Sequence, residues 1–209
     1  MSSAVNSDDP PGRTGRLILA LVATVAVWFW VVRVFMPNIA NPLADPKLAN
    51  SGGLRQASFH WTARDLDGKE VPFSEFQGHP VFLNIWATWC PPCRAELPSI
   101  NDLAARSELK EVVFLCVSVD DTRETVRQFV ASTPLVPRVL WIDPTTELPP
   151  EFQTDGIPAT FILDRSGSIV VSEVGAANWN APEVASLLSN LIKRPANTQA
   201  TGDSSATSK

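Results

Sequence analysis

The chain has 209 residues, a formal net charge of −5 and 44% hydrophobic residues. This length fits one ordinary domain with appendages, and ten Phe and seven Trp supply enough apolar side chain for a core, which argues against wholesale disorder. The acidic net charge disfavours general nucleic-acid binding. Three Cys are too few for a small fold held together by disulfides, and with only two His a metal enzyme with several protein ligands is hard to assemble.

The first distinctive feature along the chain is an apolar segment at residues 17–36, LILALVATVAVWFWVVRVFM. A helix of this length spans roughly 30 Å, the thickness of a hydrocarbon core, and Arg33 lies near one end, where its side chain can reach the interface. We expect an uncleaved transmembrane anchor. A cleaved signal peptide is the alternative, but the run is long for one and no small-residue cleavage site follows.

Charges and composition around this segment predict how the rest is organised. Positive charges favour the cytoplasmic side, and Arg13 and Arg16 precede the segment, so we expect residues 1–16 in the cytoplasm and the bulk of the chain outside it. Residues 37–54 contain three Pro and two Gly without periodicity, which is typical of a linker. Residues 195–209 form a polar low-complexity tail that we expect to be disordered.

The remaining residues, 55–194, are predicted to form one α/β domain with a mixed sheet flanked by helices on both faces. Residues 58–66 and 70–73 are expected to form an N-terminal hairpin around an Asp-Gly turn. Continuous apolar runs at 81–86 and 112–119 are typical of strands buried on both faces. Further strands are expected at 138–142, 160–163 and 169–174, and helices at 91–106, 182–192 and 121–132, the last opened by a capping box of Asp121 and Glu124.

The chemical centre of the sequence is the motif Trp89-Cys90-Pro91-Pro92-Cys93, placed where a buried strand ends and a helix begins. Side chains three apart on a helix are neighbours, about 5–6 Å apart at Cβ, which is close to the spacing of a disulfide. Such a bridge closes a very short loop and removes little entropy from the unfolded chain, so it is a poor structural staple. The pair is better suited to switch between dithiol and disulfide.

The two cysteines are expected to play different parts. Cys90 lies at the helix N-terminus, where free N–H groups and the helix dipole favour a thiolate, so it is the expected attacking sulfur. Pro91 and Pro92 suit a first helical turn because they lack N–H groups that would have no partner there. Cys93 lies one turn inward and would resolve the mixed disulfide.

A zinc site is the main alternative for a Cys pair. It needs a second pair of ligands, and His60, His79 and Cys116 repeat no ligand spacing, so we expect neither a metal nor another cofactor. Cys116 lies within an apolar run and is expected to be an inert buried thiol.

The segments GHPVFLNIWATWCPPCRAELPSI and GIPATFILDRSGSIV resemble those of the TlpA/ResA-like thiol-disulfide oxidoreductases, the membrane-anchored, extracytoplasmic branch of the thioredoxin-like family. The resemblance covers roughly residues 58–192 in element order. It implies a thioredoxin-like fold with an extra N-terminal β-hairpin and a kinship with the cytochrome c maturation thioredoxins. It also implies a single-pass protein of the bacterial inner membrane, with the catalytic domain on the periplasmic side.

Position by position, the resemblance makes Cys90 the nucleophile and Cys93 the resolving thiol. It makes Pro158 the family's cis-proline, which faces the pair, and it implies that the backbone of Ile157 pairs with a bound substrate strand. It also places Glu96 near the active site, where a partly buried carboxylate would have a raised pKa and could exchange protons with the resolving thiol. The alternative for Glu96 is an exposed acid that merely complements the helix dipole.

Other positions near the motif also match the family. Asn84 stands where ordinary thioredoxins carry a buried Asp, and an amide cannot accept a proton near neutral pH, so another base is needed if one is used. The resemblance marks Trp89 as a shield and docking surface and Trp86 as mostly core. Pro91 and Pro92 complete the expected substrate-contacting residues.

The leading hypothesis is an anchored thiol-disulfide oxidoreductase that reduces disulfides in partner proteins, with electrons from a membrane dithiol carrier. Apocytochromes c and copper-delivery proteins are the candidate substrates. Two alternatives remain open. The Cys pair could act as a disulfide-forming oxidant, which its reduction potential would reveal, or the domain could be a non-catalytic module that binds thiols, Cu(I) or partner proteins.

Overall fold

A computed structural model of the chain describes residue 24 and the ranges 43–48 and 55–194. The expected anchor at 17–36 lies outside the described residues apart from Thr24, as do the segment before it, most of the linker and the C-terminal tail. Within the part of the chain that is described, no helix has the length and apolar character needed to cross a bilayer.

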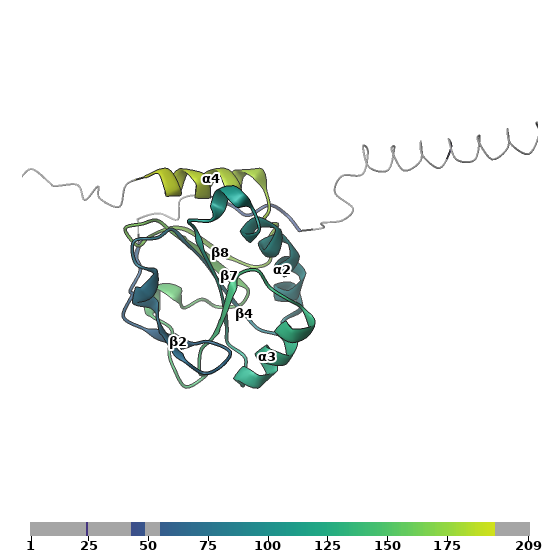
Figure 1. Ribbon diagram of the computed structural model, residues 1–209, viewed down its shortest axis with the longest axis vertical. Helices are drawn as coiled ribbons and strands as arrows, with labels where there is room; N and C mark the ends of the chain where they lie inside the picture. Colours follow the sequence, from purple (N-terminus) through teal and green to yellow (C-terminus); the bar gives the residue numbers. More distant parts are fainter. Residues whose placement is uncertain (1–23, 25–42, 49–54, 195–209) are drawn as a thin grey trace, which may run out of the picture. The chain divides into compact units, whose positions relative to one another are not determined.

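An eight-stranded mixed sheet forms the centre of the domain, in the order β1-β8-β7-β4-β5-β6-β2-β3 (Figure 1). Its central strand β4 runs parallel to β5 and antiparallel to β7, and all its residues are buried, as its continuous apolar run predicts. The strands are β1 (Arg55–Gln56), β2 (Thr62–Arg64), β3 (Glu70–Pro72), β4 (Val81–Trp86), β5 (Val113–Ser118), β6 (Arg138–Trp141), β7 (Ala159–Leu163) and β8 (Ser168–Val174).

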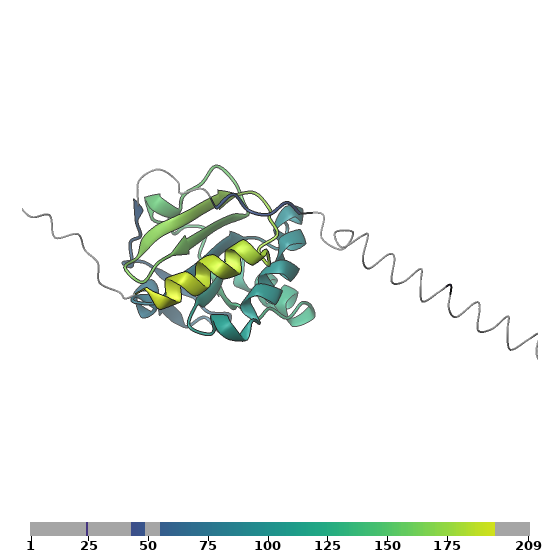
Figure 2. The same cartoon turned by 90° about the horizontal axis from the view of Figure 1, so that it is seen from above.

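Three α-helices pack on one face of this sheet rather than on both (Figures 1 and 2). They are α2 (Pro91–Ala104), α3 (Arg123–Ser132) and α4 (Pro182–Lys193), and short 3-10 helices cover Phe73–Phe76, Ser107–Leu109 and Pro150–Phe152. The expectation of helices on both faces is therefore corrected. The apolar stripes of the three helices meet the same alternate residues of the strands, so they share one core.

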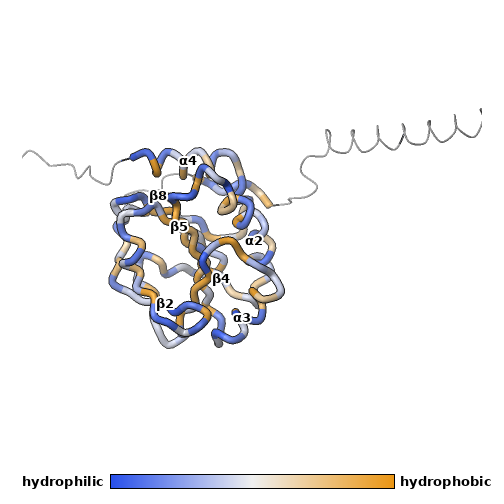
Figure 3. The backbone as a smooth tube through the Cα atoms, in the orientation of Figure 1, coloured by the Kyte–Doolittle hydropathy of each residue, from blue (hydrophilic) through white to orange (hydrophobic). Residues whose placement is uncertain are grey.

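The opposite face of the sheet is covered by aromatic side chains. Leu83 and Ile85 of β4 point into this second core, whereas Phe82 and Trp86 point toward the helices, because side chains alternate along a strand. In the second core, Trp61 stacks on Phe73 with ring centroids 4.4 Å apart. Figure 3 shows the apolar interior along β4 and β5 between these two layers.

The N-terminal hairpin is present but shorter than expected. Strands β2 and β3 pair antiparallel with Ala63 opposite Val71, and β2 also joins the main sheet through Arg64, which lies opposite Trp141 of β6. Strand β1, which the sequence pattern does not predict, pairs with β8 at the opposite edge. The hairpin therefore extends the main sheet instead of standing apart from it.

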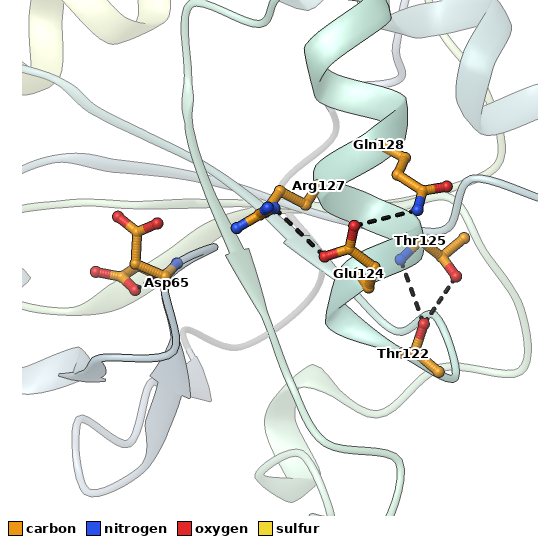
Figure 4. Close-up of polar contacts among 7 residues, drawn as sticks. Asp65, Thr122, Glu124, Thr125, Arg127 and Gln128 are labelled. Atoms are coloured by element: carbon orange, nitrogen blue, oxygen red, sulfur yellow. Dashed lines mark hydrogen bonds and ion pairs between the residues drawn. The ribbon is translucent and has the colours of Figure 1, made fainter.

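The start of α3 differs from the sequence prediction. Thr122, not Asp121, is the N-cap, and its hydroxyl accepts a hydrogen bond from the Thr125 backbone N–H at 3.3 Å (Figure 4). Glu124 pairs instead with Arg127, at 3.3 Å, one turn further along the helix. The predicted capping box is thus wrong, because Thr122, whose hydroxyl can also cap a helix, lies next to the expected cap and shifts the helix start by one position.

Candidate active site

The Cys motif lies at the junction of β4 and α2, at the carboxyl edge of the central strand. Cys90 is the N-cap of α2, and Cys90 and Cys93 are joined by a disulfide with their Cα atoms 5.3 Å apart. The backbone N–H of Cys93 donates to the Cys90 sulfur at 3.2 Å. When the bridge opens, this free end of the helix directs backbone dipoles at Cys90 and favours its thiolate.

Exposure differs sharply around the disulfide. Cys90 is 4% exposed and Cys93 is completely buried, while Pro91 and Pro92 lie on the surface. Trp89, the first residue of the motif, is 63% exposed. An approaching partner therefore meets an indole ring and two prolines first, and of the two cysteines only Cys90 keeps any exposed surface.

The loop before β7 completes the rim of the disulfide. The Ile157–Pro158 peptide bond is cis, as the family resemblance predicts. The Ile157 carbonyl oxygen lies 3.9 Å from the Cys90 sulfur, and the Pro158 carbonyl accepts a hydrogen bond from the Gly175 N–H at 2.8 Å. The backbone at Ile157 therefore lies against the Cys90 sulfur, the atom at which disulfide exchange with a partner would occur.

Glu96 lies one helical turn beyond Cys93 and is completely buried, so it is not an exposed acid at the start of a helix. Its Oε2 accepts hydrogen bonds from the Ala177 N–H at 3.1 Å and the Trp179 indole N–H at 2.9 Å. Its Oε1 accepts one from the Asn84 amide at 2.7 Å. Burial raises the pKa of Glu96 to about 7, although these three hydrogen bonds oppose the shift.

Asn84 connects Glu96 to the sheet. It lies in the middle of β4, completely buried, and its Nδ2 donates both to Glu96 and, at 2.9 Å, to the Thr160 hydroxyl on β7. Its own Oδ1 is buried without a hydrogen-bond partner among the described residues. Cys116 lies opposite it on β5 as a buried free thiol, and burial raises the pKa of that thiol further above its usual range.

Two residues of the site, Asp120 and Trp179, were not predicted from the sequence. Asp120 is buried just beyond β5, and its carboxylate accepts hydrogen bonds from the Thr88 N–H at 2.9 Å and the Thr88 hydroxyl at 2.6 Å, which holds the loop before Trp89. Trp179 is completely buried and donates to Glu96. Asp120 could have been predicted as a site residue, because it lies at the carboxyl end of β5, the strand next to β4. Trp179 could not, because nothing in the sequence around it indicates that it contacts Glu96.

Two grooves adjoin the disulfide. One, of about 570 Å³, is lined by Ile157 and by apolar side chains that include Ile85, Leu148 and Phe152. The other, of about 660 Å³, begins at Pro91 and runs along α2 toward α3. Among the described residues, no three His, Cys, Asp or Glu side chains cluster in a way that could hold a metal ion.

Comparison with known proteins agrees with this geometry. The model of the Redoxin family matches residues 46–191. The thiol-disulfide oxidoreductase ResA from Bacillus cereus is 29% identical over 160 residues, which cover 77% of this chain and 86% of that protein. ResA from Halalkalibacterium halodurans is 29% identical over 140 residues, or 65% of this chain and 75% of the relative.

Solved structures show the same fold. The structure of MTB dsbF, in mixed oxidized and reduced forms, superposes with a TM-score of 0.55 and 26% identity, covering 64% of this chain and 96% of the other. StoA from Bacillus subtilis has a TM-score of 0.50 and 22% identity over 64% of this chain and 96% of its own. The thioredoxin-like fold is therefore shared with these proteins.

Proposed function

The chain belongs to the Redoxin family and is a TlpA/ResA-like thiol-disulfide oxidoreductase; from this premise we propose that it is a membrane-anchored reductant of disulfides in extracytoplasmic proteins. The observation that carries the proposal is the asymmetric Cys pair, in which Cys90 keeps a small exposed surface, 4%, at a helix N-terminus while Cys93 is completely buried. This arrangement supports a two-step exchange with one entry point.

In the reduced enzyme, the Cys90 thiolate attacks one sulfur of a substrate disulfide, and the other substrate sulfur leaves as a thiolate and takes up a proton. A mixed disulfide then joins Cys90 to the substrate. Cys93 loses its proton and attacks the Cys90 sulfur, which releases the second substrate thiol. Two electrons pass to the substrate, and the enzyme is left with the Cys90–Cys93 disulfide.

Glu96 is the group that we propose to accept the proton of Cys93 in the second step. It follows Cys93 by one turn of α2, and its pKa of about 7 lets it act as a base near neutral pH. Asn84, at the position of the buried Asp of ordinary thioredoxins, cannot take up this proton. The burial of both Cys93 and Glu96 supports a direct exchange without bulk water.

Substrate binding is proposed to use the loop of Ile157 and Pro158. An extended substrate segment would pair with the backbone of Ile157 by strand addition, which brings its disulfide to Cys90. Trp89, Pro91 and Pro92 would form the surface on the other side of the substrate. The groove lined by Ile157, which has both apolar and polar side chains in its wall, would accept side chains that flank the substrate cysteines.

We propose that residues 17–36 anchor the protein in the bacterial inner membrane and that the catalytic domain lies on the periplasmic side. A membrane dithiol carrier would return the enzyme to its reduced state. Apocytochromes c, whose haem-attachment cysteines must be reduced, and copper-delivery proteins are the proposed substrates. The family resemblance supports both classes.

A trapping experiment tests the function. In Cys93→Ser the resolving thiol is absent, so Cys90 should stay linked to its substrate, and mass spectrometry of the adduct names the substrate class. Cys90→Ser is the matched control and should trap nothing. The reduction potential of the wild-type pair tests the direction: a value near the oxidising end of the family, about −120 mV, would contradict a reductant.

A further inference from the structure

The carboxyl group of Glu96 is surrounded so that only one of its oxygens can carry a proton. Oε2 faces the Ala177 backbone N–H and the Trp179 indole N–H, and both groups are donors that have no acceptor function. A proton on Oε2 would point at two other protons. The acid form of Glu96 must therefore carry its proton on Oε1.

The neighbour of Oε1 is the side-chain amide of Asn84, which can present either of two chemically different ends. In the structure Nδ2 faces Oε1 at 2.7 Å and donates, which fits a carboxylate. Once Oε1 is protonated, the same Nδ2 would place a donor against a donor. A half-turn of the amide would bring Oδ1 to this position, where it accepts from the Glu96 O–H.

The second contact of Asn84 allows this turn. The Thr160 hydroxyl, 2.9 Å from Nδ2, can accept a hydrogen bond or donate one. It therefore accepts from Nδ2 in the first orientation and donates to Oδ1 in the second. The remaining end of the amide has no partner that would hold it, since Oδ1 is buried and unpaired among the described residues.

We propose that Asn84 is a positioning residue for proton transfer at the disulfide: its amide adopts one orientation with the carboxylate form of Glu96 and the reverse orientation with the acid form. The proposal deepens the proposed function, because it rests on Glu96 as the proton acceptor for Cys93. Asn84 itself neither gains nor loses a proton. It stabilises the charged form through Nδ2 and directs the proton of the acid form to Oε1.

Other groups around Glu96 do not compete for this proton. Cys93, on the same helix, is held in the disulfide. Cys116, on β5, stays a neutral thiol because burial and the charge of Glu96 both raise its pKa. Within the described part of the chain, β7 contributes the hydroxyl of Thr160 to the cluster, and the segment before α4 contributes backbone and indole N–H groups.

The test follows Glu96 and Asn84 separately in the oxidised full-length protein by NMR, with ¹³C in the Glu carboxyls and ¹⁵N in the Asn side chains. The Asn84 amide signals should shift through the same midpoint as the Glu96 carboxyl, and Glu96→Gln should abolish that shift. Asn84→Leu removes both the Nδ2 donor to the carboxylate and the Oδ1 acceptor for the acid. Because the hydrogen bond to the charged form is the stronger of the two, the Glu96 midpoint should move upward by about one pH unit.

Ser118→Ala is the matched control, because it removes a buried hydroxyl on neighbouring β5 that bonds Asp120 and does not touch Glu96. It should leave the Glu96 midpoint unchanged. The proposal is overturned if the wild-type Asn84 signals stay constant through the Glu96 titration, a measurement that requires no substitution, or if Asn84→Leu leaves the midpoint in place.

The two proposals fail in different ways. If Asn84 follows Glu96 but Glu96→Gln reduces substrate disulfides as fast as the wild type at every pH, the amide reorientation stands and the role of Glu96 as proton acceptor is wrong. If Glu96→Gln slows the second step while the Asn84 signals do not titrate, Glu96 keeps its role and the positioning role of Asn84 is wrong.

Discussion

The two faces of the central sheet are covered by different kinds of side chain. The aromatic face is closed by stacked rings such as Trp61 and Phe73, and its core residues are entirely apolar. The helix face holds the disulfide and, among the described residues, the buried polar side chains, namely Asn84, Glu96, Ser99, Ser118, Asp120 and Thr160. Both faces therefore pack a hydrophobic core, but on the helix face this core also holds hydrogen-bonded polar groups beside the reacting sulfurs.

The largest expected effect comes from removing the attacking sulfur on the helix face. Cys90→Ser should lower the rate of substrate disulfide reduction to below about a thousandth of the wild-type rate. Near neutral pH a serine hydroxyl is a much weaker nucleophile than a thiolate, and it cannot form a disulfide. The rate is measured with reduced enzyme and a disulfide peptide. Cys116→Ala, which changes the buried free thiol, should keep the wild-type rate; loss of activity in both variants would contradict the separation of roles.

A substitution on the aromatic face should lower the stability of the fold and leave the rate of disulfide reduction unchanged. Phe73→Ala is expected to lower the free energy of unfolding by about 4 kcal/mol, since a completely buried ring that contacts Phe59, Trp61, Phe76 and Phe152 leaves a cavity. Urea unfolding measures the loss. Phe73→Leu should cost less, and both variants should reduce substrate at the wild-type rate per folded molecule; a large drop in that rate would show that the faces are coupled.

The burial of Glu96 predicts a pH effect confined to the helix face. Its pKa is about 7 in the fold against 4.5 in the unfolded chain, so the folded state binds the extra proton between these values. The stability from this group is complete below about pH 4.5 and falls by roughly 3 kcal/mol as the pH rises to about 7.

The measurement is the free energy of unfolding of the wild type minus that of Glu96→Gln, followed across this pH range. The difference should decrease as the pH rises. Ile162→Val, a buried change on β7 without a titratable group, should give a curve parallel to the wild type. A constant difference between wild type and Glu96→Gln would show that Glu96 is ionised like an exposed carboxylate.

The smallest expected effect concerns the loop before the disulfide. Thr88→Val removes the hydroxyl that donates to Asp120 at 2.6 Å, and should cost about 1 kcal/mol and slow disulfide exchange by up to about tenfold, because the loop that carries Cys90 loosens. Thr122→Val, which removes the cap of α3 at a similar cost, should leave exchange unchanged. Equal rates for the two variants would mean that the hydrogen bond from the Thr88 hydroxyl to Asp120 does not position the loop.

Much of the site is predictable because it depends on neighbours along the chain. The i, i+3 spacing of Cys90 and Cys93 places their sulfurs together as soon as the segment turns into a helix, and the apolar runs of β4 and β5 predict buried strands without further information. The cis bond before Pro158 was expected from the family resemblance rather than from spacing.

The tertiary structure alone decided what surrounds these residues. Whether Glu96 is exposed or buried depended on the indole of Trp179, 83 positions away, and the loop of Thr88 is held by Asp120, 32 positions away. The packing of all three helices on one face was likewise not readable from their individual patterns. Local spacing determines contacts within about one helical turn or between a strand and the helix that follows it, but which distant segments meet is set by how the layers pack, and no single segment contains that information.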